Sequence, residues 1–139
     1  MENLEGNQPS VLIIDDDPSQ WSPYKRPLEH NGYKCECVGD GIKALQLLAD
    51  KHFDAVIMDL GLPQDIEQRE MPERTDVENG EWIYGLLCKS TTAPILITSG
   101  YMESIAASEA IARMRPASVL PKPFFPEELI SAVNNLLER

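Results

Sequence analysis

The sequence predicts an α/β domain in which a five-stranded parallel sheet carries helices on both faces. Two observations lead to this fold class. Short apolar runs of the kind found in buried strands recur along the chain, and amphipathic stretches with helical spacing lie between them. This alternation is typical of a parallel sheet built with right-handed crossovers. The chain has 139 residues, of which 42% are hydrophobic and 25% charged, as expected for one globular domain.

The expected strands are apolar runs, most of them rich in β-branched residues, at positions 11–14, 33–38, 55–60, 94–99 and 118–120. The first run, VLII, is apolar throughout, which indicates a strand buried on both faces. Polar and apolar residues alternate in the second, YKCECV, so Cys35 and Cys37 should share one face. We interpret them as small core residues, because neither His30 nor His52 falls at ligand spacing.

The expected helices are amphipathic stretches at positions 42–51, 80–89, 104–114 and 126–139. The last of them starts with Pro126 and has acidic residues in its first turn, both of which favour a helix start. The first crossover, WSPYKRPLE, keeps helical spacing although it contains Pro23 and Pro27. A short or kinked helix is expected there, capped by Ser22 and starting at Pro23.

Residues 1–9 are mostly polar and resemble neither a signal peptide nor a transit peptide, so we expect a flexible tail ahead of a domain at 10–139. Residues 64–81 contain seven acidic side chains and two arginines, which predicts an exposed acidic loop inserted at about 64–80. The net charge of −11 argues against direct binding to nucleic acid or to an anionic membrane. Three cysteines without an export signal indicate a reducing, cytoplasmic compartment.

Chemically reactive side chains stand at the ends of four expected strands. Three consecutive carboxylates, Asp15 to Asp17, follow the first strand, and Asp59 ends the third. Thr98 ends the fourth strand, and the fifth runs into Lys122. The carboxyl ends of parallel strands gather at one edge of a sheet, where ligands bind. Such convergence from four separate segments is harder to obtain by chance than any single motif.

The crowded carboxylates predict a bound cation. Two of them at about 5 Å repel by roughly 3 kcal/mol at an effective dielectric constant of about 20, so a cation or a raised pKa must offset the charge. Mg²⁺ prefers oxygen ligands and leaves room for water and phosphate. Asp59 beside Mg²⁺ and Lys122 could attack a phosphoryl group to give an aspartyl phosphate, which the Thr98 hydroxyl could then bond.

From about residue 10 to 139, the chain resembles the receiver domain of two-component response regulators. The segments VLIIDDDPS, VIMDLGLP, ILITSG and LPKPF resemble the family's motifs and occur in the same order. The resemblance implies a flavodoxin-like sheet of strand order 2-1-3-4-5. It also implies a phosphoacceptor signalling module, not a turnover enzyme, that receives phosphate from a histidine kinase or phosphotransfer protein. Phosphorylation would then switch the binding of an output partner or promote dimerisation.

The same resemblance assigns roles to residues at the sheet edge. Asp59 is the implied phosphoacceptor, and it binds Mg²⁺ together with Asp15, Asp16 and the backbone carbonyl of Gly61.

Two further residues are implied to contact the phosphoryl group: Thr98 as the switch hydroxyl and Lys122 as its ionic partner. The peptide between Lys122 and Pro123 is implied to be cis. The chain departs from the family pattern at Val119, where the family usually has an aromatic switch residue, and in the acidic insert.

Two other functions stay open from the sequence. The segment DDDPS resembles the signature of haloacid-dehalogenase phosphatases, in which Asp15 would be the nucleophile. That reading gives Asp59 no role. The second alternative is a degenerate receiver that acts as an unphosphorylated binding module, although the acidic, threonine and lysine positions are intact.

Overall fold

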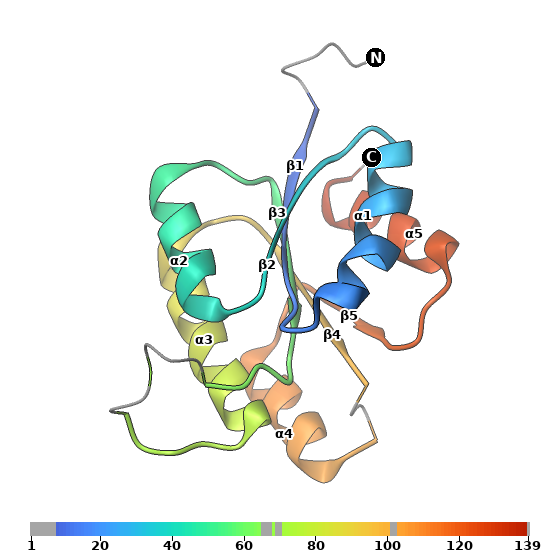
Figure 1. The fold of residues 1–139 in the computed structure, drawn as a ribbon. Coiled ribbons are helices and arrows are strands. Elements are labelled where there is room, and N and C mark those ends of the chain that lie inside the picture. The colour runs from blue at the N-terminus through green and yellow to red at the C-terminus, as the bar shows by residue number, and fades with distance from the viewer. Residues whose placement is uncertain (1–7, 65–67, 69–70, 101–102, 139) are drawn as a thin grey trace.

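A parallel sheet of five strands forms the centre of the computed structural model, which describes residues 8–64, 68, 71–100 and 103–138 (Figure 1). The strands lie in the order β2-β1-β3-β4-β5, and every neighbouring pair is parallel. Their bounds are β1 (Ser10–Ile14), β2 (Lys34–Val38), β3 (Ala55–Asp59), β4 (Ile95–Ser99) and β5 (Ser118–Pro121). The predicted fold class and strand order are confirmed.

Helices cover both faces of this sheet (Figure 1). They are α1 (Trp21–His30), α2 (Gly41–Asp50), α3 (Asp76–Ser90), α4 (Ile105–Met114) and α5 (Pro126–Leu136), and a short 3-10 helix, η1 (Pro18–Gln20), leads into α1. Helices α1 and α5 pack on one face, and α2, α3 and α4 pack on the other.

Two hydrophobic clusters form the core, one on each face of the sheet. Along β1, Val11 and Ile13 pack toward α1 and α5, whereas Leu12 and Ile14 pack toward α2, α3 and α4. All four are fully buried, and each such side chain contributes about 1.5–3 kcal/mol of hydrophobic stabilisation. This burial on both faces explains why the strand is apolar throughout. Cys35 and Cys37 both pack against the cluster on the α1 and α5 face, as the alternation in β2 predicts.

The predicted N-terminal tail lies mostly outside the described residues, which begin at Gln8. The carbonyl of Pro9 accepts a hydrogen bond from the Lys34 backbone N–H at 2.9 Å, so the chain already contacts the sheet one residue before β1. The domain boundary at residue 10 stays a prediction.

The expected start of the first helix was wrong by two residues. Helix α1 begins at Trp21, Pro23 lies within its first turn, and Ser22 is not its cap. The reason is the preceding helix η1, where the Asp17 side chain accepts from the Ser19 backbone N–H at 3.0 Å. A proline directly after such a cap favours a helical turn, so the chain enters α1 earlier than expected.

The prediction of an acidic loop at about 64–80 was also wrong in part. Helix α3 begins at Asp76 and therefore includes the end of that segment. A capping box explains the early start. The Thr75 hydroxyl accepts from the Glu78 backbone N–H at 3.1 Å, and the Thr75 backbone N–H donates to the Glu78 carboxylate at 3.0 Å. The T-D-V-E spacing in the sequence is the signal for this motif. Residues 65–67 and 69–70 of the insert lie outside the described residues.

Replacing Thr75 with alanine should lower the free energy of unfolding by about 1 kcal/mol, because the first turn of α3 loses its side-chain acceptor. Urea denaturation monitored by circular dichroism measures this change. The control is Thr92→Ala, the same substitution at an exposed position beyond the other end of α3. Equal stability of the two variants would contradict the role of the capping box.

Candidate functional site

Three carboxylates meet at the edge where β1 and β3 end. One oxygen from each of Asp15, Asp16 and Asp59 lies within 4.8 Å of the others. Since β1 and β3 are neighbours in the sheet, their carboxyl ends are adjacent, which explains why residues far apart in sequence converge. Asp15 is buried, Asp59 is half-buried and Asp16 is exposed to solvent. This set of oxygen donors fits a divalent cation such as Mg²⁺ or Ca²⁺.

Lys122 connects two of these carboxylates. Its ammonium donates to Asp15 Oδ2 at 2.8 Å and to Asp59 Oδ2 at 3.3 Å. Residue 122 directly follows β5, its backbone N–H donates to the Ser99 carbonyl at 3.0 Å, and the peptide to Pro123 is cis. Burial alone would lower the pKa of Lys122, but its hydrogen bond to Asp15 and the nearby negative charges hold that pKa above its usual value. The ammonium therefore stays charged.

Asp59 is in an environment that disfavours its negative charge. Burial raises the pKa of Asp59, and although the charge of Lys122 lowers it, the charge of Asp15 raises it further. Burial also raises the pKa of Asp16, and the negative charges of Asp15 and Asp59 raise it further. The Gly61 backbone N–H donates to Asp59 Oδ1 at 3.1 Å, which orients the carboxylate. A bound cation would offset this uncompensated negative charge.

Thr98 lies in the interior beside this cluster. Thr98 and Asp59 are partners in the last pair of residues between β4 and β3, and Thr98 is fully buried. Its hydroxyl oxygen is 3.0 Å from the hydroxyl oxygen of Tyr24, which in turn donates to Asp15 Oδ2 at 3.1 Å. Burial raises the pKa of Tyr24 above its usual value, so the tyrosine keeps its proton.

Tyr24 is the site residue that sequence reasoning missed. Its helical spacing with Trp21 and Leu28 indicated only packing. A hydroxyl on the buried face of α1 was the available signal, since a buried tyrosine hydroxyl usually has a hydrogen-bond partner. Trp21 also reaches the site, because its indole N–H donates to the Asp15 carbonyl at 2.9 Å. Val119 is 37% exposed on β5 and has no polar side-chain atom.

Hydrogen bonds from Asn79 connect α3 to the loop after Asp59. The Asn79 amide donates to the carbonyls of Leu62 and Pro63 at 3.1 and 3.2 Å. The Gln68 amide donates to the Asn79 side-chain oxygen at 2.8 Å, and both side chains are buried. Sequence reasoning missed Asn79 because it lies in the segment interpreted as a solvated acidic loop.

Gly80 allows the same loop to lie directly on α3. A Cβ atom at position 80 would overlap the carbonyl oxygen of Leu60 and lie 2.9 Å from its carbonyl carbon. Because Leu60 follows Asp59 immediately, this close approach helps set the position of the carboxylate.

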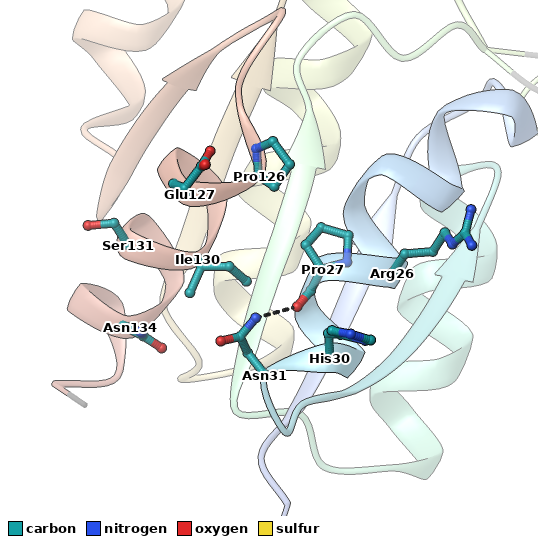
Figure 2. Close-up of a pocket in the computed structure, with 9 residues that line it drawn as sticks. All are labelled: Arg26, Pro27, His30, Asn31, Pro126, Glu127, Ile130, Ser131 and Asn134. Atoms are coloured by element: carbon teal, nitrogen blue, oxygen red, sulfur yellow. Dashed lines mark hydrogen bonds between the residues drawn. The ribbon is translucent and has the colours of Figure 1, made fainter.

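A hollow lies away from the acidic cluster, between α1 and α5 (Figure 2). It has a volume of about 680 Å³, and none of the cluster carboxylates lines it. Figure 2 shows the side chains around it, which come from α1, the residue after α1, and α5: Arg26, Pro27, His30, Asn31, Pro126, Glu127, Ile130, Ser131 and Asn134.

The chain matches the family model described as the response regulator receiver domain over residues 11–134. It belongs to this family. Response regulator MprA of Mycobacterium sp. strain KMS is 30% identical to this receiver domain over 129 residues, which cover 93% of the chain and 50% of MprA. The receiver domain thus spans about half the length of the curated relatives it matches.

Solved structures of other response regulators have the same fold. The receiver domain of the Francisella response regulator 1452 is 27% identical with a TM-score of 0.73, covering 94% of this chain and 98% of that one. A Burkholderia pseudomallei response regulator, solved with a phosphorylated aspartic acid, a calcium ion and citrate, is 26% identical with a TM-score of 0.72. That match covers 94% of this chain and 69% of the other.

Receiver domains of two-component systems are phosphoacceptor signalling modules, and the acidic pocket of Asp15, Asp16 and Asp59 is consistent with that function. Among the helices that the structure describes, none is long and apolar enough to span a bilayer.

Proposed function

We propose that Asp59 takes up a phosphoryl group from a histidine kinase or a phosphotransfer protein, and that this modification changes the affinity for an output partner. One observation carries the proposal: the half-buried Asp59 carboxylate accepts from the Lys122 ammonium at 3.3 Å and has an oxygen within 4.8 Å of oxygens of Asp15 and Asp16. An attacking carboxylate, a cationic partner and a cation site therefore occur together. These are the groups that phosphoryl transfer requires.

We infer that Mg²⁺ is the cation, held by Asp15, Asp16, Asp59 and the Gly61 carbonyl. Carboxylate and carbonyl oxygens are the ligands that this ion prefers, and so few protein ligands leave positions for water and phosphate. When bound, Mg²⁺ would neutralise charge on the phosphoryl oxygens. The Burkholderia pseudomallei response regulator was solved with a phosphorylated aspartic acid and a calcium ion, which supports a role for an aspartate and a divalent cation here.

The residues of the chain then have distinct roles in transfer. A carboxylate oxygen of Asp59 attacks the phosphorus atom, and the bond from phosphorus to the donor atom breaks with its electron pair leaving on the donor. Lys122 pairs with one phosphoryl oxygen, and the Thr98 hydroxyl donates to another. Their starting positions support these roles, because Lys122 already bonds Asp59 and Thr98 is opposite Asp59 in the sheet.

Phosphorylation adds about two negative charges at the end of β3. We expect Thr98 and residues 99–103 to move toward them, which biases the surface formed by α4, β5 and α5 for partner binding or dimerisation. Residues 101–102 of this segment lie outside the described residues. In this proposal residues 10–139 act in the cytoplasm as one switch unit and not as a turnover enzyme.

The structure disfavours the phosphatase alternative, because the Asp15 side chain is buried. Its Oδ2 accepts from Lys122 and Tyr24, and its Oδ1 accepts from the Asp17 backbone N–H at 3.0 Å. Asp15 is only 1% exposed. A nucleophile must instead be accessible to its substrate, as the half-buried Asp59 is.

Trapping of the acyl phosphate tests the proposed function. The chain is incubated with acetyl phosphate and Mg²⁺, reduced with labelled borohydride and digested, and the labelled residue is located by mass spectrometry. We expect the label at Asp59. A label at Asp15 would establish the phosphatase chemistry, and absence of label together with absence of phosphate uptake would identify an unphosphorylated binding module.

A further inference from the structure

The hydroxyl of Tyr24 connects two groups of the site from a helix on the face of the sheet. It lies 3.1 Å from Asp15 Oδ2 and 3.0 Å from Thr98 Oγ1. Thr98 is 0% exposed, and Asp15 and Tyr24 are each 1% exposed, so water does not compete for these bonds. Asp15 directly follows β1, whereas Tyr24 lies in α1 and Thr98 in β4.

A count of protons gives the direction of each bond. The Tyr24 hydroxyl donates to Asp15 Oδ2, which also accepts from the Lys122 ammonium at 2.8 Å, and a carboxylate accepts hydrogen bonds only. The single hydroxyl proton of Tyr24 therefore points to Asp15. The contact with Thr98 then requires the Thr98 hydroxyl to donate to the Tyr24 oxygen. In this state the Thr98 proton is committed to Tyr24.

A phosphoryl group on Asp59 would need a hydrogen bond from the same Thr98 proton. Phosphoryl oxygens on Asp59 only accept hydrogen bonds, so Thr98 can donate to them only if it releases Tyr24. Tyr24 cannot follow easily, because it is held in the core with its ring 5.4 Å from that of Phe124, centroid to centroid. Its hydroxyl can keep its bond to Asp15 while Thr98 turns away.

We propose that Tyr24 is a positioning residue that holds the Thr98 hydroxyl in the unphosphorylated chain and so makes the phosphorylated conformation harder to reach. This inference rests on the proposed function, in which Thr98 donates to a phosphoryl group on Asp59. It also makes α1 part of the switch, because Tyr24 loses a hydrogen-bond partner whenever Thr98 turns to the phosphoryl group.

Tyr24→Phe tests this inference because it keeps the ring and removes the hydroxyl. The measurement is the affinity of the full chain for beryllofluoride, a phosphoryl mimic, by calorimetry at saturating Mg²⁺. We expect binding about three- to tenfold tighter than in the unmodified chain, the factor that corresponds to one buried hydrogen bond. Tyr24→Met, which also lacks a hydroxyl, should shift the affinity in the same direction.

A double-mutant cycle separates this role from a purely structural one. Thr98→Val removes the other hydroxyl at nearly constant shape, so adding Tyr24→Phe to it should leave the beryllofluoride affinity unchanged. The inference is overturned if Tyr24→Phe binds as the unmodified chain does. It is equally overturned if Tyr24→Phe tightens binding to the same extent when Thr98 is valine, because the effect would then act through Asp15.

Asp59→Asn, measured in the same way, tests the proposed function separately. If Asp59→Asn binds beryllofluoride as well as the unmodified chain does, the assignment of the phosphoacceptor fails. If Asp59→Asn loses binding while Tyr24→Phe has no effect, the assignment stands and only the role of Tyr24 fails.

Discussion

Asp59→Asn should eliminate phosphate uptake from acetyl phosphate and Mg²⁺, with a rate loss of at least about a thousandfold, the scale observed when a covalent nucleophile is removed. The amide nitrogen cannot attack phosphorus, and the amide oxygen is a poor nucleophile. The side chain keeps its shape, and its oxygen can still accept from the Gly61 backbone N–H, so the fold should persist. Uptake is measured with radiolabelled acetyl phosphate or by intact mass.

The matched control for this prediction is Asp50→Asn. Asp50 is exposed at the end of α2, on another part of the surface, and the substitution removes the same charge. Uptake should equal that of the unmodified chain. Persistent uptake by Asp59→Asn, with label at another residue, would contradict the assignment of the phosphoacceptor.

Gly80→Ala should produce a large loss of stability, about 2–4 kcal/mol in the free energy of unfolding. The added Cβ atom would overlap the carbonyl oxygen of Leu60, which belongs to the backbone and cannot rotate away. Either α3 or the loop after Asp59 must move. Because the loop begins at the acidic cluster, we also expect weaker Mg²⁺ binding. Urea denaturation and Mg²⁺ titration measure the two effects.

Gly85→Ala gives a control on the same helix. A Cβ atom at position 85 would meet nothing within 4 Å, so alanine should stabilise α3 by about 0.5–1 kcal/mol through its higher helix propensity. The two substitutions should therefore have opposite signs. A Gly80→Ala variant as stable as the unmodified chain would show that α3 does not closely approach Leu60 in solution.

The two corrected helix starts have a common cause. Hydrophobic spacing identified both helices, but it carries little information about where a helix begins. Those positions are decided by side-chain hydrogen bonds to the backbone, at Asp17 before η1 and at Thr75 before α3. The second was available as a short motif in the sequence. The first depends on how the chain turns after β1.

The fold and the main acidic cluster follow from the sequence by itself. Apolar runs alternate with amphipathic stretches, which determines a parallel sheet, and a parallel sheet brings the carboxyl ends of its strands to one edge. Asp15, Asp59, Thr98 and Lys122 could thus be predicted to converge, because the end of a strand is a position that local pattern defines.

Only the tertiary structure decided which side chains support that cluster. The Tyr24 hydroxyl meets a threonine 74 positions away, and Gly80 meets the backbone of Leu60. Such contacts depend on the rotation and tilt of a helix against the sheet. Those are set by the packing of the whole core, so hydrophobic periodicity shows which face of a helix is buried but not which atom that face will contact.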